Sequence, residues 1–132
     1  MSVSRPLTIL IAEDSKPVVE MLTELLAGAG RIEVVGVADS GSAVYESIRR
    51  LKPDVVVLDL QSKAGSGTDV IRAVRANEAL RTTHIIVISS HASPQIRAGC
   101  LGLGANEYYD KVKELPTLAA KLGELAAAKG SR

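Results

Sequence analysis

The sequence predicts an α/β fold in which five parallel strands, in the order 2-1-3-4-5, are covered by five helices on both faces. Short β-branched apolar runs recur along the chain, and the run at 55–58 is apolar throughout, as is typical of strands buried on both faces of a sheet. Segments with helical spacing alternate with these runs, which indicates parallel crossovers. Because such crossovers are right-handed, few topologies remain, and this order is common for five strands.

Five segments are expected to form the strands, and three of them end on polar side chains. Glu13 follows the first strand, Asp59 ends the third and Ser89 ends the fourth. The carboxyl ends of parallel strands share one edge of the sheet, which is where open α/β folds place their chemistry. The expected strands span residues 7–12, 33–38, 54–59, 84–89 and 107–109.

The segments between the strands show helical periodicity and helix-terminating residues. Ser15 and Ser40 are expected to cap the first and second helices, Gly28 and Gly30 to end the first, and Pro53 to follow the second. The helices expected after the third and fourth strands begin near residue 68 and at residue 94. The apolar positions expected to face the sheet are Val18, Leu22, Leu25, Leu26 and Ala29, then Val44, Ile48 and Leu51, then Val70, Ile71 and Val74, and finally Leu115, Leu118, Leu122 and Leu125.

The fourth helix, 94–103, is expected to be the weakest. It contains Gly99 and Gly102, and each glycine costs about 1 kcal/mol relative to alanine in a helix interior. We expect this helix to be mobile and to rearrange when the protein changes state.

The bulk composition indicates one cytoplasmic domain spanning 1–132, with a core over about 7–128 and a flexible tail at 129–132. The formal net charge of +1 provides no field that would attract nucleic acid or a membrane surface. No apolar run has the length of a signal-peptide core or a membrane span. The single Cys100 is expected to be a small helix residue in a reducing compartment.

Charged side chains are expected to gather at the carboxyl edge of the sheet. In the predicted strand order, Glu13, Asp14 and Asp59 converge, with Ser89 to one side and Lys111 to the other. Three adjacent carboxylates repel one another, and an oxygen-only cluster suits Mg²⁺. A hydroxyl and an ammonium group suit an anion, so the set predicts phosphoryl transfer. The alternative is that Asp59 only begins a turn.

These residues resemble the receiver domain of two-component response regulators, over essentially the whole chain. Each match alone is weak, but six in the same order at strand ends are specific. The matching residues are Glu13-Asp14, Asp59, Gly67, Ser89, Gly104-Ala105 and Lys111.

The resemblance implies that Asp59 accepts a phosphoryl group from a sensor histidine kinase or a phosphotransfer protein. Asp14, Asp59 and the backbone carbonyl of Gln61 would hold Mg²⁺, and Glu13 would act through water. Such a domain turns over no separate substrate. Its signal would pass to a downstream effector protein or a fused output domain.

The resemblance also implies a switch. Ser89 and Lys111 would bind phosphoryl oxygens, and Tyr108 would move inward, changing the face formed by the fourth helix, the fifth strand and the last helix. The alternative is that Tyr108 packs against the last helix while Tyr109 points into the core, since adjacent strand residues face opposite sides. Spacing favours Ser89 over Ser90 as the functional hydroxyl.

Five positions depart from the family pattern or tune it. Ser62 and Lys63 replace a usual Met-Pro pair, and Lys63 is expected to be solvated. Val112 stands where proline is usual, so the preceding bond is expected to be trans. Gln61 and His91 occupy positions that tune hydrolysis in the family, although His91 is equally readable as an exposed loop residue.

Three rival functions are weighed against this interpretation, and the sequence lacks features that the first two require. A Mg²⁺-dependent phosphohydrolase would place its nucleophilic Asp at the first strand and needs a cap. A nucleotide-binding domain would need a glycine-rich loop where the first strand is followed by Glu-Asp-Ser. A pseudo-receiver would keep the fold and act only through protein contacts. His84, which opens a strand, is interpreted as an isolated structural residue.

Overall fold

The computed structural model describes residues 5–39, 41–61, 67–91 and 93–130. Its centre is one five-stranded parallel sheet in the order β2-β1-β3-β4-β5, which confirms the predicted class and topology. The strands are β1 (Leu7–Ala12), β2 (Ile32–Ala38), β3 (Val55–Asp59), β4 (His84–Ser89) and β5 (Glu107–Asp110). The helices are α1 (Lys16–Ala27), α2 (Gly41–Leu51), α3 (Gly67–Ala76), α4 (Pro94–Leu103) and α5 (Leu115–Gly130), with a short 3₁₀ helix, η1 (Glu78–Leu80).

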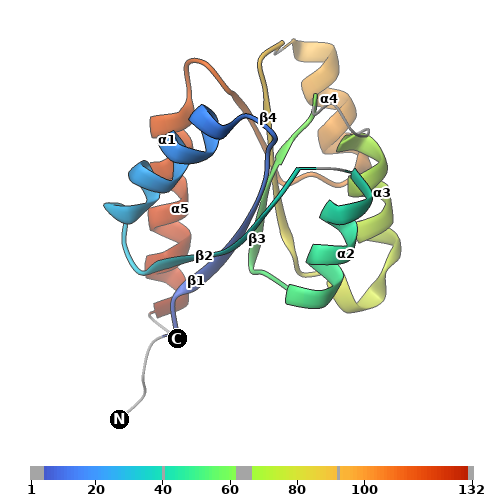
Figure 1. Cartoon of the computed structure of the whole chain (residues 1–132). Coiled ribbons are helices and arrows are strands. Elements are labelled where there is room, and N and C mark those ends of the chain that lie inside the picture. Colours follow the sequence, from blue (N-terminus) through green and yellow to red (C-terminus); the bar gives the residue numbers. More distant parts are fainter. Residues whose placement is uncertain (1–4, 40, 62–66, 92, 131–132) are drawn as a thin grey trace.

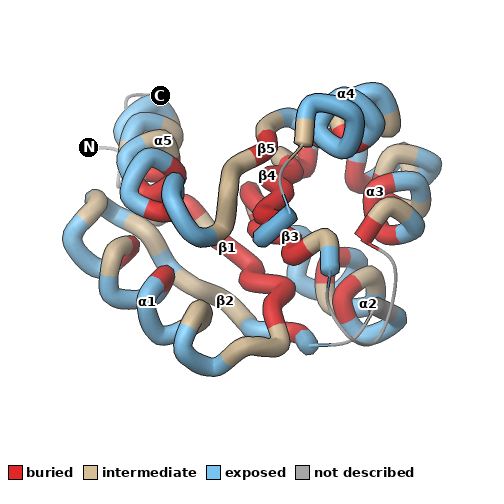
Figure 2. The backbone as a smooth tube through the Cα atoms, turned by 90° about the horizontal axis from the view of Figure 1, so that it is seen from above, coloured by how far each residue is buried: buried red, intermediate tan, exposed pale blue. Residues whose placement is uncertain are grey.

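The helices form two layers. α1 and α5 cover one face of the sheet, and α2, α3 and α4 cover the other (Figure 1). Seen from above, the largely buried strands β1, β3 and β4 lie between helices whose outer surfaces are exposed, whereas β2 is mostly intermediate (Figure 2). Within the described residues, no helix is both long and apolar enough to cross a membrane.

Alternation along the central strands divides the core into two clusters. Ile9 and Ile11 of β1 pack toward α1 and α5, whereas Leu10 packs toward α2, α3 and α4. The same alternation separates the two tyrosines of β5: Tyr108 belongs to the α2-α3-α4 cluster, and Tyr109 packs against the α1-α5 cluster. The alternative in which Tyr108 packs against the last helix is therefore wrong.

Helix starts and ends differ from expectation in detail. Ser15 is the N-cap of α1, but its side chain makes no cap hydrogen bond; instead its backbone N–H donates to Glu13 Oε2 at 2.9 Å. Ala29 lies beyond the end of α1, and Leu51 is 38% exposed. Ser40, the expected cap of α2, lies outside the described residues.

The end of α4 is fixed by an arginine from α3. Gly104 caps α4 with φ of +116°, a conformation that favours glycine. Arg75 Nε donates to Gly104 O at 2.8 Å, and its other nitrogens bond Arg81 O, Thr83 O and Asn106 Oδ1. α4 is therefore anchored at its C-terminal end, far from the carboxyl edge of the sheet.

α5 continues to Gly130, so Lys129 lies in this helix although the expected core ended at 128. Lys129 Nζ lies 2.5 Å from Asp54 Oδ2 and donates to Pro6 O at 3.1 Å. Thr8 donates two further hydrogen bonds to the same carboxylate oxygen. These contacts hold the end of α5 against the start of β1 and β3, which local sequence patterns do not reveal.

Candidate functional site

The expected acidic cluster is present at the carboxyl edge of the sheet. β1 and β3 are neighbours, with Ala12 paired to Leu58, so the residues that follow, Glu13 and Asp59, come level. One carboxylate oxygen from each of Glu13, Asp14 and Asp59 lies within 4.8 Å of the others. Glu13 is 1% exposed and Asp59 is 2% exposed. Two buried carboxylates thus meet a third, Asp14, that is only partly buried.

Lys111 brings a positive charge to this cluster. Its Nζ lies 2.9 Å from Glu13 Oε1 and 3.1 Å from Asp59 Oδ2. The contact with Glu13 is an ion pair without the alignment of a hydrogen bond, whereas the contact with Asp59 is a hydrogen bond. Lys111 reaches the site because its backbone N–H donates to Ser89 O, which continues the β4–β5 pairing.

The electrostatics favour a second cation. Burial raises the pKa of Glu13, and the neighbouring Asp59 raises it further, although Lys111 and the Ser15 N–H oppose the shift. Burial alone would lower the pKa of Lys111, but the two carboxylates outweigh burial and raise it. The single charge of Lys111 therefore does not offset the negative charge of the three carboxylates. Their oxygen atoms form a donor set that fits Mg²⁺.

Ser89 lies beside the cluster and contacts two residues singled out from the sequence. It is fully buried; its Oγ accepts from His91 N at 3.1 Å and lies 3.4 Å from Gln61 Oε1. Gln61 N donates to Asp59 Oδ1 at 3.1 Å. Ser90, which spacing set aside, also donates to Gln61 Oε1 at 3.0 Å. That contact forms because the loops after β3 and β4 lie close together, which the sequence does not show.

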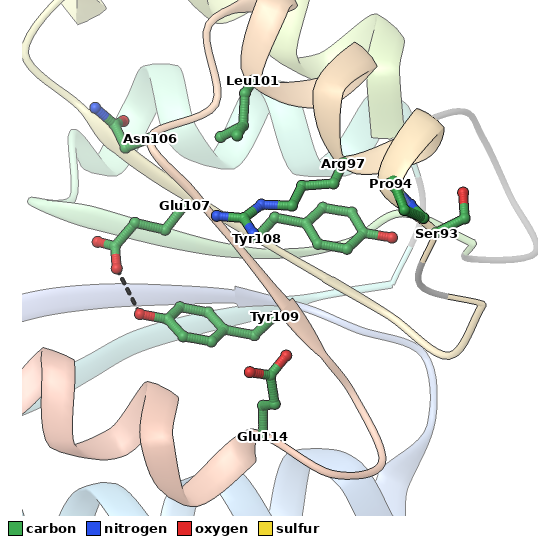
Figure 3. Close-up of a pocket in the computed structure, with 9 residues that line it drawn as sticks. All are labelled: Ser93, Pro94, Arg97, Leu101, Asn106, Glu107, Tyr108, Tyr109 and Glu114. Carbon is green, nitrogen blue, oxygen red and sulfur yellow. Dashed lines mark hydrogen bonds between the residues drawn. The ribbon is translucent and has the colours of Figure 1, made fainter.

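A pocket of about 490 Å³ opens between α4 and β5, and Tyr108 is one of the residues that line it (Figure 3). The Tyr108 ring lies beneath the Arg97 side chain, and the residue is only 8% exposed. Its hydroxyl is buried and has no hydrogen-bond partner among the described residues. Tyr108 therefore already occupies an inward position in this structure.

His84 is not isolated, which corrects the interpretation from sequence. Its Nε2 lies 2.5 Å from Glu107 Oε2, and Tyr109 Oη donates to the other oxygen of Glu107 at 2.5 Å. Because these residues come from neighbouring strands, their contact depends on the β4–β5 register, which the sequence alone leaves open.

Two expectations about the departures from the family pattern differ in outcome. No cis peptide bond occurs in the described ranges, so the predicted trans bond between Lys111 and Val112 is confirmed. Ser62 and Lys63 lie outside the described residues. Cys100 is a buried free thiol in α4, as expected.

Known proteins match the chain along nearly its whole length. The family model for the response regulator receiver domain matches residues 9–123. A protein-glutamate methylesterase/protein-glutamine glutaminase from Symbiobacterium thermophilum is 37% identical over 113 residues, covering 83% of this chain and 30% of that protein. A second such protein, number 5 from Myxococcus xanthus, is 34% identical over 129 residues, covering 96% and 37%. The chain thus spans about a third of these relatives.

Solved structures show the same fold. The signal receiver domain of NarL from Mycobacterium tuberculosis has a TM-score of 0.81 and 29% identity, with 97% of this chain and 99% of that chain covered. The response regulator domain of CheB from Thermotoga maritima has a TM-score of 0.79 and 21% identity, with 97% and 98% covered. With the strand order and the acidic cluster already in place, the family-model match over residues 9–123 shows that the chain belongs to the response regulator receiver domain family.

Proposed function

We propose that Asp59 is the phosphoryl acceptor of this receiver domain. The observation that carries the proposal is the burial of its carboxylate beside Glu13, Asp14 and Lys111. In the transfer, the P–N bond of a phosphohistidine on a sensor kinase or phosphotransfer protein breaks and its electron pair stays on nitrogen. A carboxylate oxygen of Asp59 forms the new P–O bond, which gives an acyl phosphate.

Asp14, Asp59 and the backbone carbonyl of Gln61 would hold Mg²⁺, with Glu13 acting through water. When bound, the ion offsets the negative charges of the carboxylates and the incoming phosphoryl group. Lys111 contributes a fixed positive charge, and Ser89 contributes a hydroxyl donor. We infer that both bind oxygens of the transferred group.

The change at Asp59 would reach a partner through the surface formed by α4, β5 and α5. Ser89 lies at the end of β4, next to β5, and Tyr108 lines the pocket between β5 and α4. A phosphoryl group that draws Ser89 toward Asp59 would alter the space that Tyr108 occupies. The partner would be a separate effector protein or an output domain in the same chain.

Gln61 and His91 would set the lifetime of the phosphoryl group. Their side chains meet beside Asp59, with His91 Nδ1 3.1 Å from Gln61 Oε1. From this position they can either orient or exclude the water that hydrolyses the acyl phosphate.

The described domain fits signalling without turnover of a separate substrate, although it matches about a third of proteins named as protein-glutamate methylesterases. An enzymatic output in a fused domain would be compatible with this proposal. We also propose a cytoplasmic location, where the phosphodonor proteins would be found.

The deciding experiment is incubation with Mg²⁺ and acetyl phosphate, followed by intact mass measurement. We expect one phosphoryl group on the wild type, none without Mg²⁺, and none on Asp59→Asn. A wild type that never gains mass or binds beryllofluoride would favour the pseudo-receiver. A mass gain that survives Asp59→Asn would place the acceptor elsewhere.

A further inference from the structure

The hydroxyl of Ser89 is already engaged in this structure. A serine hydroxyl has one proton to donate and two lone pairs. Its oxygen accepts from His91 N at 3.1 Å, and the contact with Gln61 Oε1 at 3.4 Å uses the proton because a carbonyl oxygen can only accept. Ser89 is fully buried, so solvent does not readily replace either partner.

The Gln61 side chain is held in place by two further groups. Ser90 Oγ donates to its Oε1 at 3.0 Å. His91 Nδ1 lies 3.1 Å from the same oxygen, a hydrogen bond when Nδ1 carries the proton. Ser89, Ser90 and His91 are consecutive, so the end of β4 and the two residues after it contact one side-chain oxygen of Gln61, the second residue after β3.

The main chain of Gln61 is also fixed. Its N–H donates to Asp59 Oδ1 at 3.1 Å, and Leu60 N donates to Ile88 O at 3.0 Å. The base of the side chain is therefore anchored, and the amide oxygen is anchored by the β4 turn.

We propose that the Gln61 amide oxygen competes with the phosphoryl group for the single proton of Ser89, and that Ser90 positions this competitor. This inference rests on the proposed function, because it concerns the hydroxyl that would bind a phosphoryl oxygen. Ser89 cannot donate to both acceptors at once, so the contact with Gln61 must break when the phosphorylated form is made. The contact thereby stabilises the unphosphorylated form.

The size of the effect follows from the geometry. A distance of 3.4 Å is long for a hydrogen bond between two oxygens, so the competition is mild. Removing the Gln61 side chain is expected to tighten binding of a phosphoryl mimic by about two- to fivefold, the range of a weak net hydrogen bond. Removing the Ser90 hydroxyl should act in the same direction by a smaller factor, since Gln61 stays but is held less firmly.

The test is calorimetric titration of the Mg²⁺-loaded protein with beryllofluoride, which measures affinity at equilibrium and is independent of hydrolysis rate. Gln61→Ala removes the amide and keeps the backbone N–H that donates to Asp59 and the backbone carbonyl that would hold Mg²⁺. Ser90→Ala removes the positioning hydroxyl, and Ser90→Thr should restore wild-type affinity. Gln95→Ala is the matched control, because Gln95 is exposed on α4 and takes no part in the contact.

A double-mutant cycle separates competition from a general change of shape. In a Ser89→Ala background, the gain from Gln61→Ala should disappear, because no proton remains to be contested. Equal or weaker affinity in Gln61→Ala, or a gain that persists without Ser89, would overturn the competition. A wild type that binds no beryllofluoride would instead overturn the proposed function, and this inference with it.

Discussion

The ammonium group of Lys111 lies 3.1 Å from Oδ2 of Asp59, across 52 residues of sequence. Lys111 also pairs with Glu13, so a single ammonium group faces both buried carboxylates. Without Mg²⁺, the fold depends on this side chain to offset their repulsion.

Lys111→Met should therefore lower the free energy of unfolding in metal-free buffer by about 2–4 kcal/mol, because it leaves buried carboxylates without their partner. Mg²⁺ should restore much of that loss by supplying the missing positive charge. Urea unfolding with and without Mg²⁺ measures both effects, with Lys113→Met, an exposed neighbour, as control. A loss that Mg²⁺ leaves unchanged would contradict this account.

Lys129→Met should destabilise the protein in a pH-dependent way. Burial alone would raise the pKa of Asp54, but hydrogen bonds from Lys129 and Thr8 outweigh it and lower the pKa below its usual 3.8. The ionised form is thus favoured in the folded state, so the stabilisation is present above pH 3.8 and is lost as pH falls through the lower folded value.

The expected loss is about 1 kcal/mol at pH 7, discounted because the Asp54 side chain is 36% exposed. Denaturant unfolding at pH 7 and near pH 3 should show the difference from wild type narrowing in acid. Lys121→Met on the same helix is the control. A difference of equal size at both pH values would argue against the ion pair as its source.

Tyr108→Phe should raise the free energy of unfolding by about 1 kcal/mol. Its hydroxyl is buried and has no partner in the described part of the chain, and an unsatisfied buried group costs about 1–3 kcal/mol. Tyr109→Phe is the matched comparison: it should lower stability by about 1 kcal/mol, because that hydroxyl donates to Glu107. Thermal unfolding should rank Tyr108→Phe above wild type and Tyr109→Phe below; the reverse ranking would refute the assignment.

Backbone amides in α4 should exchange with solvent faster than those in α1. Gly99 lies inside this helix, and a Cβ there would meet no atom within 4 Å. Gly99→Ala should therefore strengthen α4 by up to about 1 kcal/mol and slow its exchange. Exchange in α4 as slow as in α1 would count against a mobile helix.

Gly104→Ala is the contrasting variant and should be destabilising by more than 1 kcal/mol. The residue has φ of +116°, and a Cβ would lie 2.7 Å from Arg75 Cγ. Arg75 cannot move away cheaply, because its guanidinium bonds four acceptors.

His91→Ala should change the rate at which phosphorylated protein loses its phosphoryl group. His91 contacts Gln61 beside Asp59, where a side chain either orients or blocks water. Loss of mass over time after removal of acetyl phosphate gives the rate, and His84→Ala, at the opposite end of β4, is the control. An unchanged rate would show that His91 is a solvent-exposed loop residue without this role.

Much of the fold follows from local chemistry. β4 spans His84–Ser89 and is built around the apolar run at 85–88, because the interior of a strand covered on both faces is mostly apolar. α4 ends before Gly104 because that glycine can adopt the left-handed cap. The order of polar residues after the strands then predicted that Glu13, Asp14 and Asp59 would meet, since parallel strands share their carboxyl edge.

Local sequence patterns do not predict contacts that depend on the register between strands or on how close two loops come. The pairing of His84 with Glu107, the bond from Ser90 to Gln61 and the anchoring of Lys129 on Asp54 all join residues distant in sequence. A hydrogen bond is decided within a few tenths of an ångström, whereas periodicity fixes only which face a residue takes.

The sequence by itself therefore determined the sheet, its order and the set of side chains at its edge, because burial and strand direction are enough to specify them. The tertiary structure alone decided which of those side chains touch. It placed Lys111 between two carboxylates and directed the Ser89 hydroxyl to donate to Gln61 Oε1. Only packed strands and loops bring these atoms to bonding distance.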